Sequence, residues 1–202
     1  MPESYLRRSP LAERGLVGRA RAESDGPAGV TMGERAFPVI VDLRAKPDNK
    51  TFLKAAEKKL GFALPLEANT AAGADDVSAL WMAPDQWWVV AAEDSVQAGS
   101  LAASLAKLKA GVTEIGESRT CIRISGPKAR ALLAKGCPLD LHPSLFQAGQ
   151  CARSLIGKVP IALHQMSDGP VYDIYVLRSY AEFLWLWLED AAGEYGLEVV
   201  EA

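Results

Sequence analysis

The stretch CIRISGPKARALLAKGCPLDLHP, residues Cys121 to Pro143, carries the clearest structural signals in the chain. An apolar strand pattern runs into Gly126-Pro127, where glycine frees the backbone and proline presets the φ angle of the first helical residue. A short helix is expected to follow and to end at Gly136 and Pro138. The stretch therefore predicts a strand, a tight turn and a helix. It contains no nucleophile paired with a base and no metal-binding spacing.

Strand and helix patterns alternate on both sides of this unit. Strands are expected at residues 37–43, 77–83, 87–92, 150–156, 159–165 and 171–177, and helices at 51–60, at 96–109 and from Ser179, which forms an S-x-x-E capping box with Glu182. The predicted fold class is α+β, with mixed, largely antiparallel sheets and layered helices. The globular region, residues 36–202, has room for two subdomains with a break near 111–118.

Residues 1–35 differ from the rest, because they combine many charges with few apolar side chains. Such a segment cannot bury enough apolar surface to order itself. We therefore expect an extended N-terminal arm at 1–35. It either orders on a partner or stays a disordered tail, and the sequence leaves both alternatives open.

Composition limits the class of protein. The chain has 202 residues, 49% of them hydrophobic, and a formal net charge of −3, which argues against a nucleic-acid binder. No apolar run approaches the length of a membrane span, and the N-terminus has no secretory signal pattern. Three cysteines without a C-x-x-C pair fit reduced, buried thiols in a cytoplasmic protein.

The usual catalytic and cofactor motifs are missing. No G-x-G-x-x-G or G-x-x-x-x-G-K-[ST] pattern is present, so neither standard nucleotide site is expected. His142 and His164 each stand alone, without metal-ligand spacing. The carboxylates Asp75, Asp76 and Asp140 have no complementary acid or base beside them. We therefore expect no catalytic, cofactor-binding or metal residue in this chain.

Four apolar residues are candidates for a partner interface. Trp87 and Trp88 are adjacent in a strand and must point to opposite faces, so one is expected in the core and the other at a subunit contact. In the last helix an apolar stripe formed by Phe183, Leu184, Trp187, Leu188 and Ala191 leaves Trp185 and Leu186 outside it. A helix that is apolar nearly all round is buried on more than one side. Either the rest of the chain or another subunit covers this second face.

The C-terminal segment is also strongly acidic. From Arg178 onward one basic residue faces six acidic ones. This acidity is either a solvated face or a docking patch for a basic partner.

Four stretches resemble the gamma subunit family of heterotetrameric sarcosine oxidase. They are APDQWWVV (83–90), RISGPKARALLAKGCPLDLHP (123–143), FQAGQCARS (146–154) and RSYAEFLWLWLEDAAGEYG (178–196). The resemblance implies a fold like that of the folate-binding aminomethyltransferases. It also implies a complex of alpha, beta, gamma and delta subunits that oxidatively demethylates sarcosine to glycine and hydrogen peroxide and passes the one-carbon unit to tetrahydrofolate.

In that family FAD, FMN, NAD, tetrahydrofolate and zinc are expected on the other subunits, and the gamma chain carries no catalytic residue. The resemblance thus predicts a non-catalytic subunit that braces the alpha subunit. Two alternatives remain: a subunit of a related complex that oxidises another N-methyl amino acid, or a free-standing folate-dependent one-carbon transferase. For the second, Asp75, Asp76, Trp81 and Trp88 are the available residues.

Overall fold

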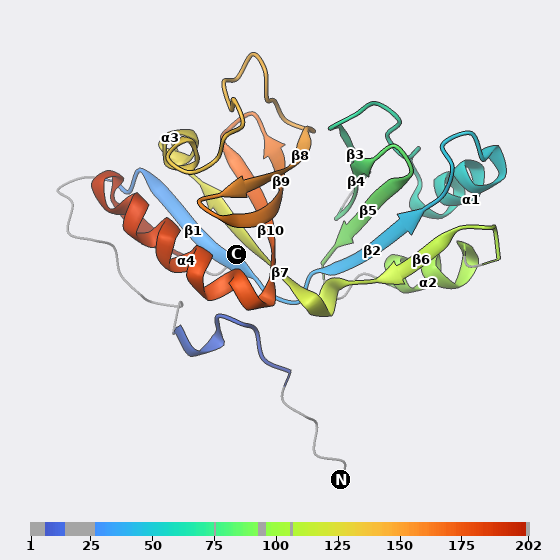
Figure 1. Ribbon diagram of the computed structural model, residues 1–202, viewed down its shortest axis with the longest axis horizontal. Helices are drawn as coiled ribbons and strands as arrows, with labels where there is room; N and C mark the ends of the chain where they lie inside the picture. Colours follow the sequence, from blue (N-terminus) through green and yellow to red (C-terminus); the bar gives the residue numbers. More distant parts are fainter. Residues whose placement is uncertain (1–6, 15–26, 75, 93–95, 106, 201–202) are drawn as a thin grey trace, which may run out of the picture.

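The chain folds into two β-sheets that lie side by side, each with helices on its outer face (Figure 1). The computed structural model describes residues 7–14, 27–74, 76–92, 96–105 and 107–200. The six-stranded sheet has the order β11 (Leu197–Val199), β1 (Val30–Arg35), β7 (Arg119–Ser125), β10 (Val171–Leu177), β9 (Val159–Ser167), β8 (Cys151–Ile156). The five-stranded sheet has the order β3 (Ala71–Ala74), β4 (Val77–Ala83), β5 (Gln86–Ala91), β2 (Val39–Arg44), β6 (Gly111–Glu114).

Helices cover the two sheets in pairs. The helices are α1 (Lys50–Leu60), α2 (Val96–Leu105), α3 (Ala129–Ala134) and α4 (Arg178–Ala192), with short 3-10 turns η1 (Ala12–Arg14), η2 (Gly116–Ser118) and η3 (Gly193–Tyr195). All strand pairs are antiparallel except β1 with β11, which is parallel. The expected α+β class with largely antiparallel sheets and layered helices is confirmed.

Three apolar cores hold these layers together. One packs the six-stranded sheet against α3 and α4, and a second packs the five-stranded sheet against α1 and α2. The third lies between the two sheets and includes Ile40, Leu80, Trp88, Cys121 and Tyr175. Trp87 belongs to the second core and Trp88 to the third. The prediction that these neighbouring tryptophans point to opposite faces of one strand is therefore confirmed.

The strand–turn–helix unit forms as the sequence predicts. Strand β7 ends at Ser125, Gly126 adopts a φ of +107°, and α3 begins at Ala129. The Lys128 amide donates to the Gly29 carbonyl over 2.9 Å, which ties this turn to the residue before β1. A Cβ at Gly126 would lie 2.6 Å from the same carbonyl oxygen. Glycine is therefore required here by both the backbone angle and the available space.

Replacing Gly126 by alanine tests this double requirement. We expect Gly126→Ala to lower the free energy of unfolding by roughly 3 kcal/mol, because strain from a positive φ adds to a clash with backbone. Gly61→Ala is the matched control: Gly61 has a φ of +82° but no atom within 4 Å of a built Cβ, so it should cost only about 1 kcal/mol. Urea unfolding measures both, and equal costs would contradict the steric argument.

The expected boundary of the N-terminal arm at residue 35 is wrong. Residues Val30–Arg35 form β1, which pairs with β7 on one side and β11 on the other. Val30 and Met32 are fully buried, while the charged Glu34 and Arg35 find partners in Thr120 and Asp173. On the sequence alone its charges made the segment look unfit for burial. In the folded sheet Arg35 is paired with Asp173, and Glu34 accepts a hydrogen bond from Thr120.

Part of the arm before β1 packs on its own chain. Leu11 is buried in the core beside α4. Arg14 forms an ion pair with Glu182, and the Arg178 guanidinium donates to the Arg8 carbonyl over 2.6 Å. Residues 7–14 thus lie against α4 in Figure 1. The prediction of an extended arm at 1–6 and 15–26 lies outside the described residues.

The chain changes sheets twice. It passes from β1 into the five-stranded sheet at β2, and returns at Ile115–Ser118 between β6 and β7. The return lies within the expected break at 111–118. Because β1 belongs to the later sheet, the six-stranded half is built from two segments of sequence, whereas the five-stranded half comes from one continuous segment between β1 and β7.

The first residue of the last helix and the face that it buries both differ from the expectation. It starts at Arg178, directly after β10, and Leu177 stands at the N-cap without a side-chain hydrogen bond. The Ser179–Glu182 capping box does not form, because both residues already lie inside the helix. The buried stripe is Ala181, Leu184, Trp185, Leu188 and Ala192. Leu184 and Leu188 are buried as expected, but Phe183, expected in the stripe, is exposed, and Trp185, expected outside it, is buried.

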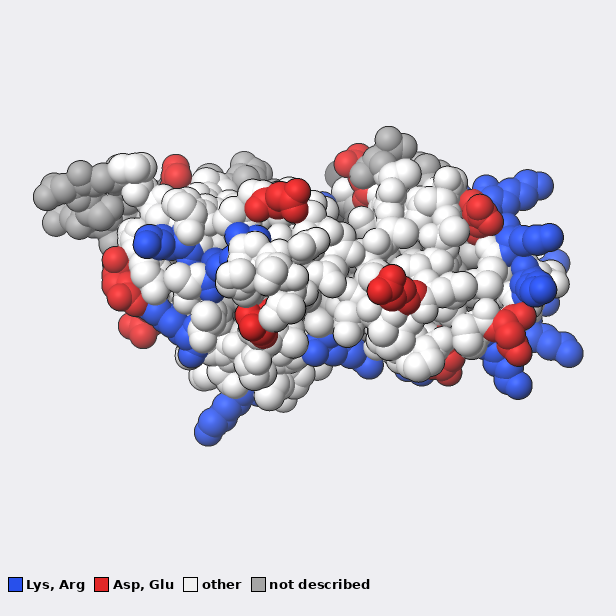
Figure 2. Space-filling view, turned by 90° about the horizontal axis from the view of Figure 1, so that it is seen from above, with Lys and Arg blue, Asp and Glu red and all other residues white. Residues whose placement is uncertain are grey.

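Charge is unevenly distributed along the molecule. The face in Figure 2 shows Lys and Arg gathered at the end that carries α1, whose four lysines are exposed. At the opposite end of the long axis lie α4 and the residues after it (Figure 1), with Glu182, Asp190, Glu194 and Glu198. The end with α1 is therefore rich in cations, whereas the α4 side mixes carboxylates with cations that pair with them, as Arg14 does with Glu182 and Lys135 with Glu194.

Candidate functional site

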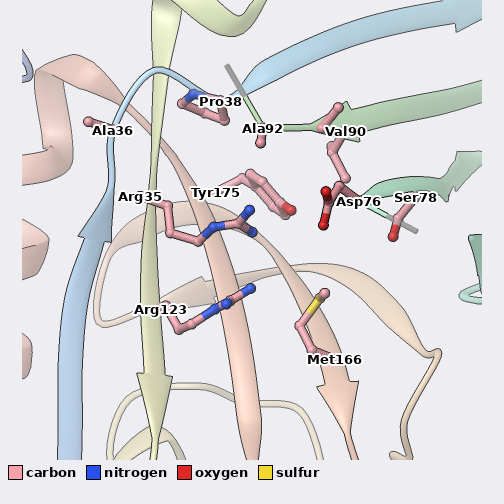
Figure 3. Close-up of a pocket in the computed structure, with 11 residues that line it drawn as sticks. Arg35, Ala36, Pro38, Asp76, Ser78, Val90, Ala92, Arg123, Met166 and Tyr175 are labelled. Atoms are coloured by element: carbon pink, nitrogen blue, oxygen red, sulfur yellow. The ribbon is translucent and has the colours of Figure 1, made fainter. Parts of the chain in front are cut away.

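A pocket of about 360 Å³ lies between the two sheets. Its walls come from β1, β7, β9 and β10 of one sheet and from β4 and β5 of the other (Figure 3). Arg35 and Arg123 project into it from the six-stranded sheet, and Asp76 and Ser78 line the opposite wall. Pro38, Val90 and Met166 supply apolar surface. The pocket thus combines cations on one wall with a carboxylate and a hydroxyl on the other.

The two arginines are held by one buried carboxylate. The side chain of Asp173 is completely buried on β10. Its oxygens accept hydrogen bonds from Arg123 Nε at 2.7 Å and Arg123 NH2 at 2.9 Å, and from Arg35 NH1 at 2.7 Å. A buried charge is tolerated only when it is paired and hydrogen-bonded. Asp173 therefore positions both guanidinium groups, and it raises the pKa of Arg123.

Three ionisable groups near this cluster, His164, Tyr175 and Cys121, have pKa values shifted away from those that acid–base or nucleophilic chemistry at neutral pH requires. Burial lowers the pKa of His164 to about 4, so its ring is neutral. Burial raises the pKa of the Tyr175 hydroxyl and of the Cys121 thiol well above their usual ranges. General acids and bases work best with a pKa near the operating pH, and a thiol must ionise to attack. The pocket therefore has the chemistry of a binding site.

The remaining described residues add no metal or thiol chemistry. No group of three His, Cys, Asp or Glu side chains close enough to bind a metal occurs among them. The three cysteines are free and buried, as expected, and burial raises the pKa of Cys151 to about 12. His142 is exposed in a loop, where its Nδ1 lies 2.7 Å from the Ser144 hydroxyl. Within the described residues, no helix is long and apolar enough to cross a membrane.

The depressed pKa of His164 predicts acid sensitivity. The unfolded chain takes up this proton near pH 6.5 and the folded chain only near pH 4. The stabilisation from neutral His164 is complete above pH 6.5 and is lost as the pH falls toward 4. Between pH 7 and pH 5 the free energy of unfolding should drop by about 2 kcal/mol from this group.

The His164→Gln variant should lose this part of the pH dependence, as measured by urea unfolding at both pH values. His142→Gln, which changes the exposed histidine, is the control and should behave as the wild type. An unchanged pH dependence in His164→Gln would contradict the assignment.

Three of the four candidate interface residues are buried in the cores of the chain itself. Trp87 and Trp185 have no exposed surface, and Trp87 Nε1 donates to the Pro65 carbonyl over 2.6 Å. Both are therefore removed as candidates for a partner contact: Trp87 is the tryptophan of its pair that enters a core beside a helix, and for Trp185 the chain itself supplies the cover, which is one of the two alternatives. For Trp87 the cover comes from α1, since Phe52 lies against its ring. For Trp185 it comes from the six-stranded sheet.

Trp88 is the third buried residue, in the core between the sheets, and Leu186 is the one candidate that lies at the surface. Trp88 is 5% exposed, with the Arg119 guanidinium 4.8 Å and that of Arg153 5.8 Å from its ring centre. A hollow of about 120 Å³ opens beside it. Leu186 is 42% exposed. It continues an apolar row on the outer face of α4 with Tyr180 and Phe183, which are 44% and 56% exposed.

The carboxylates and tryptophans considered for a pterin site do not come together. Asp76 lines the inter-sheet pocket, whereas Trp88 lines the separate hollow. Trp81 packs against the core beneath α1 and α2. Asp75 lies outside the described residues. The residues that do form the pocket cluster, Arg35, Arg123 and Asp173, were missed.

A signal for the cluster exists in the sequence. Arg123 stands between Ile122 and Ile124, and Asp173 stands between Tyr172 and Ile174. A single charged residue inside an apolar strand pattern needs a partner of opposite charge. One strand with a lone arginine and another with a lone aspartate therefore suggest that these two side chains pair.

Comparison with known proteins assigns the chain to a family. The model of the family described as "Sarcosine oxidase, gamma subunit family" matches residues 44–194. The sarcosine oxidase subunit gamma of Corynebacterium sp. strain P-1 is 32% identical over 196 residues, which cover 96% of this chain and 94% of that protein. An Arthrobacter protein of the same name is also 32% identical over 196 residues, with the same coverage. The chain belongs to the sarcosine oxidase gamma subunit family.

Solved structures agree with this sarcosine oxidase gamma family assignment. A chain of the heterotetrameric sarcosine oxidase from Corynebacterium sp. U-96, solved in complex with pyrrole 2-carboxylate, matches with a TM-score of 0.83 and 30% identity, covering 94% of this chain and 96% of that one. The glycine cleavage system aminomethyltransferase T from Bartonella henselae matches with a TM-score of 0.66 and 16% identity, covering 94% of this chain and 58% of that one. The second match concerns the fold alone, and it confirms the expected aminomethyltransferase-like fold.

Proposed function

We propose that this chain is the gamma subunit of a heterotetrameric sarcosine oxidase and serves that oxidoreductase as a structural subunit. The observation that carries the proposal is the match to a chain of the Corynebacterium sp. U-96 heterotetramer over 96% of its length. The finer proposal follows the family resemblance. The complex oxidatively demethylates sarcosine to glycine with release of hydrogen peroxide, and transfers the one-carbon unit to tetrahydrofolate in the cytoplasm.

The same proposal places the chemistry on the other subunits. The alpha, beta and delta subunits hold FAD, FMN, NAD, tetrahydrofolate and zinc, and this chain supplies no catalytic residue. The pocket region supports this division, because the pKa of Tyr175 in the pocket and those of Cys121 and His164 near Asp173 are all shifted away from neutrality. Cys121 and Cys151, whose pKa values are raised by burial, point the same way.

The outer face of α4 is the surface proposed to contact the alpha subunit. It presents Tyr180, Phe183 and Leu186 as a row of exposed apolar side chains at helical spacing. Aromatic residues are enriched at the centres of protein interfaces. A subunit that docks here through a related fold would brace the alpha subunit.

Co-purification with a tagged alpha subunit tests the docking face. We expect Phe183→Asp to lower the amount of this chain recovered with the alpha subunit at least about tenfold, because it places a charge in the centre of the apolar row. Folding of the isolated chain should be unchanged, since Phe183 is 56% exposed.

Leu145→Asp is the matched control, because Leu145 is equally apolar and 61% exposed but lies in the loop after α3. Normal assembly of Phe183→Asp, or equal loss with both variants, would contradict the proposed interface. A complex made without this chain that keeps its assembly and its sarcosine turnover would contradict the structural role itself.

A further inference from the structure

The inter-sheet pocket contains charged side chains that the packing of two sheets does not require. It encloses about 360 Å³, and two arginines reach its interior from neighbouring strands. Asp173 neutralises only one of these two positive charges, and His164 beside it is uncharged near neutral pH because burial lowers its pKa to about 4. The buried wall of the pocket therefore carries one net positive charge.

The hydrogen-bonding capacity of the arginines is not exhausted. Within the described residues Arg123 uses Nε and NH2 on Asp173, and Arg35 uses NH1. A guanidinium group has five N–H donors in a fixed fork that matches a carboxylate. The side chains are 29% and 31% exposed, and Figure 3 shows both guanidinium groups directed into the pocket. The donors left over are aimed at the space that a ligand would fill.

We propose that this pocket binds a small organic monocarboxylate, with its carboxylate on Arg35 and Arg123 and its apolar part against Pro38, Val90 and Met166. Asp173 fixes the guanidinium groups before the ligand arrives, so little side-chain freedom is lost on binding. Asp76 on the opposite wall repels a second negative charge and selects against dicarboxylates and phosphate. The site lies on this chain's own residues and does not depend on the proposed role in the complex.

Methionine-methyl NMR of the full-length chain tests the proposal directly. Four methionines are present, and Met166 lies in the pocket, whereas Met32 and Met82 are buried in two of the cores and act as internal references. The probe is phenylacetate, and phenylacetamide is its neutral isostere. We expect phenylacetate to shift the Met166 signal in a saturable way while Met32 and Met82 stay in place, and phenylacetamide to bind at least about tenfold more weakly.

Two variants separate the ligand site from the fold. Arg35→Gln should weaken phenylacetate binding at least about tenfold, and the fold should survive because Asp173 keeps both bonds to Arg123. Ala92→Phe adds a ring where an exposed alanine lines the pocket, and it should abolish binding without touching the ion pairs. Arg153→Gln, which changes an arginine outside the pocket, is the control and should bind normally.

Several outcomes would overturn the proposal. They are an unmoved Met166 signal, equal binding of the amide and the acid, tighter binding of glutarate or inorganic phosphate than of phenylacetate, or unchanged binding in both Arg35→Gln and Ala92→Phe. None of these results bears on assembly through α4, so this inference and the proposed function can fail separately.

Discussion

A completely buried carboxylate sets the arrangement of the six-stranded sheet. Asp173 has no exposed surface, and an ion in the protein interior destabilises the fold by several kcal/mol unless it is fully paired. Arg123 on β7 and Arg35 on β1 supply that pairing. The requirement connects three adjacent strands through side chains as well as through backbone hydrogen bonds. It also gives the polar end of β1 a reason to stay in the sheet beside β7, beyond the part of β1 that pairs with β11.

The same pairing determines what the space between the sheets can do. Because the guanidinium groups are held on the face that meets the five-stranded sheet, that wall of the pocket is cationic and faces Asp76 on the other wall. Burial raises the pKa of Tyr175 in the pocket and of Cys121 near Asp173, and it lowers the pKa of His164 to about 4. Such an arrangement suits the binding of an anion on the cationic wall. The outer face of α4 is apolar and exposed. A subunit that binds partners and a small anion, and leaves the chemistry to others, accounts for both surfaces.

Sequence reasoning succeeded where local rules decide the structure. Gly126-Pro127 forms the turn between β7 and the short helix α3, α1 at Lys50–Leu60 matches the helix expected at 51–60, and Trp87 and Trp88 point to opposite faces. It failed where tertiary partners decide. Two stripes of nearly equal apolarity run along α4, and only the sheet that it packs against shows that Trp185 is inside and Phe183 outside. Likewise, the Gly-, Glu- and Arg-containing β1 looked like part of a flexible arm, because Thr120 and Asp173 lie 86 and 138 residues away from their partners.

A double-mutant cycle between Arg35 and Asp173 tests most directly whether this buried pairing organises the fold. The free energy of unfolding is measured for the wild type, Arg35→Gln, Asp173→Asn and the double variant, beside the same cycle for the exposed pair of Arg44 and Asp85, 3.9 Å apart. We predict a coupling energy of at least about 2 kcal/mol for Arg35 with Asp173, and below about 0.5 kcal/mol for the exposed pair. A coupling energy for Arg35 and Asp173 as small as that of the exposed pair would contradict the account.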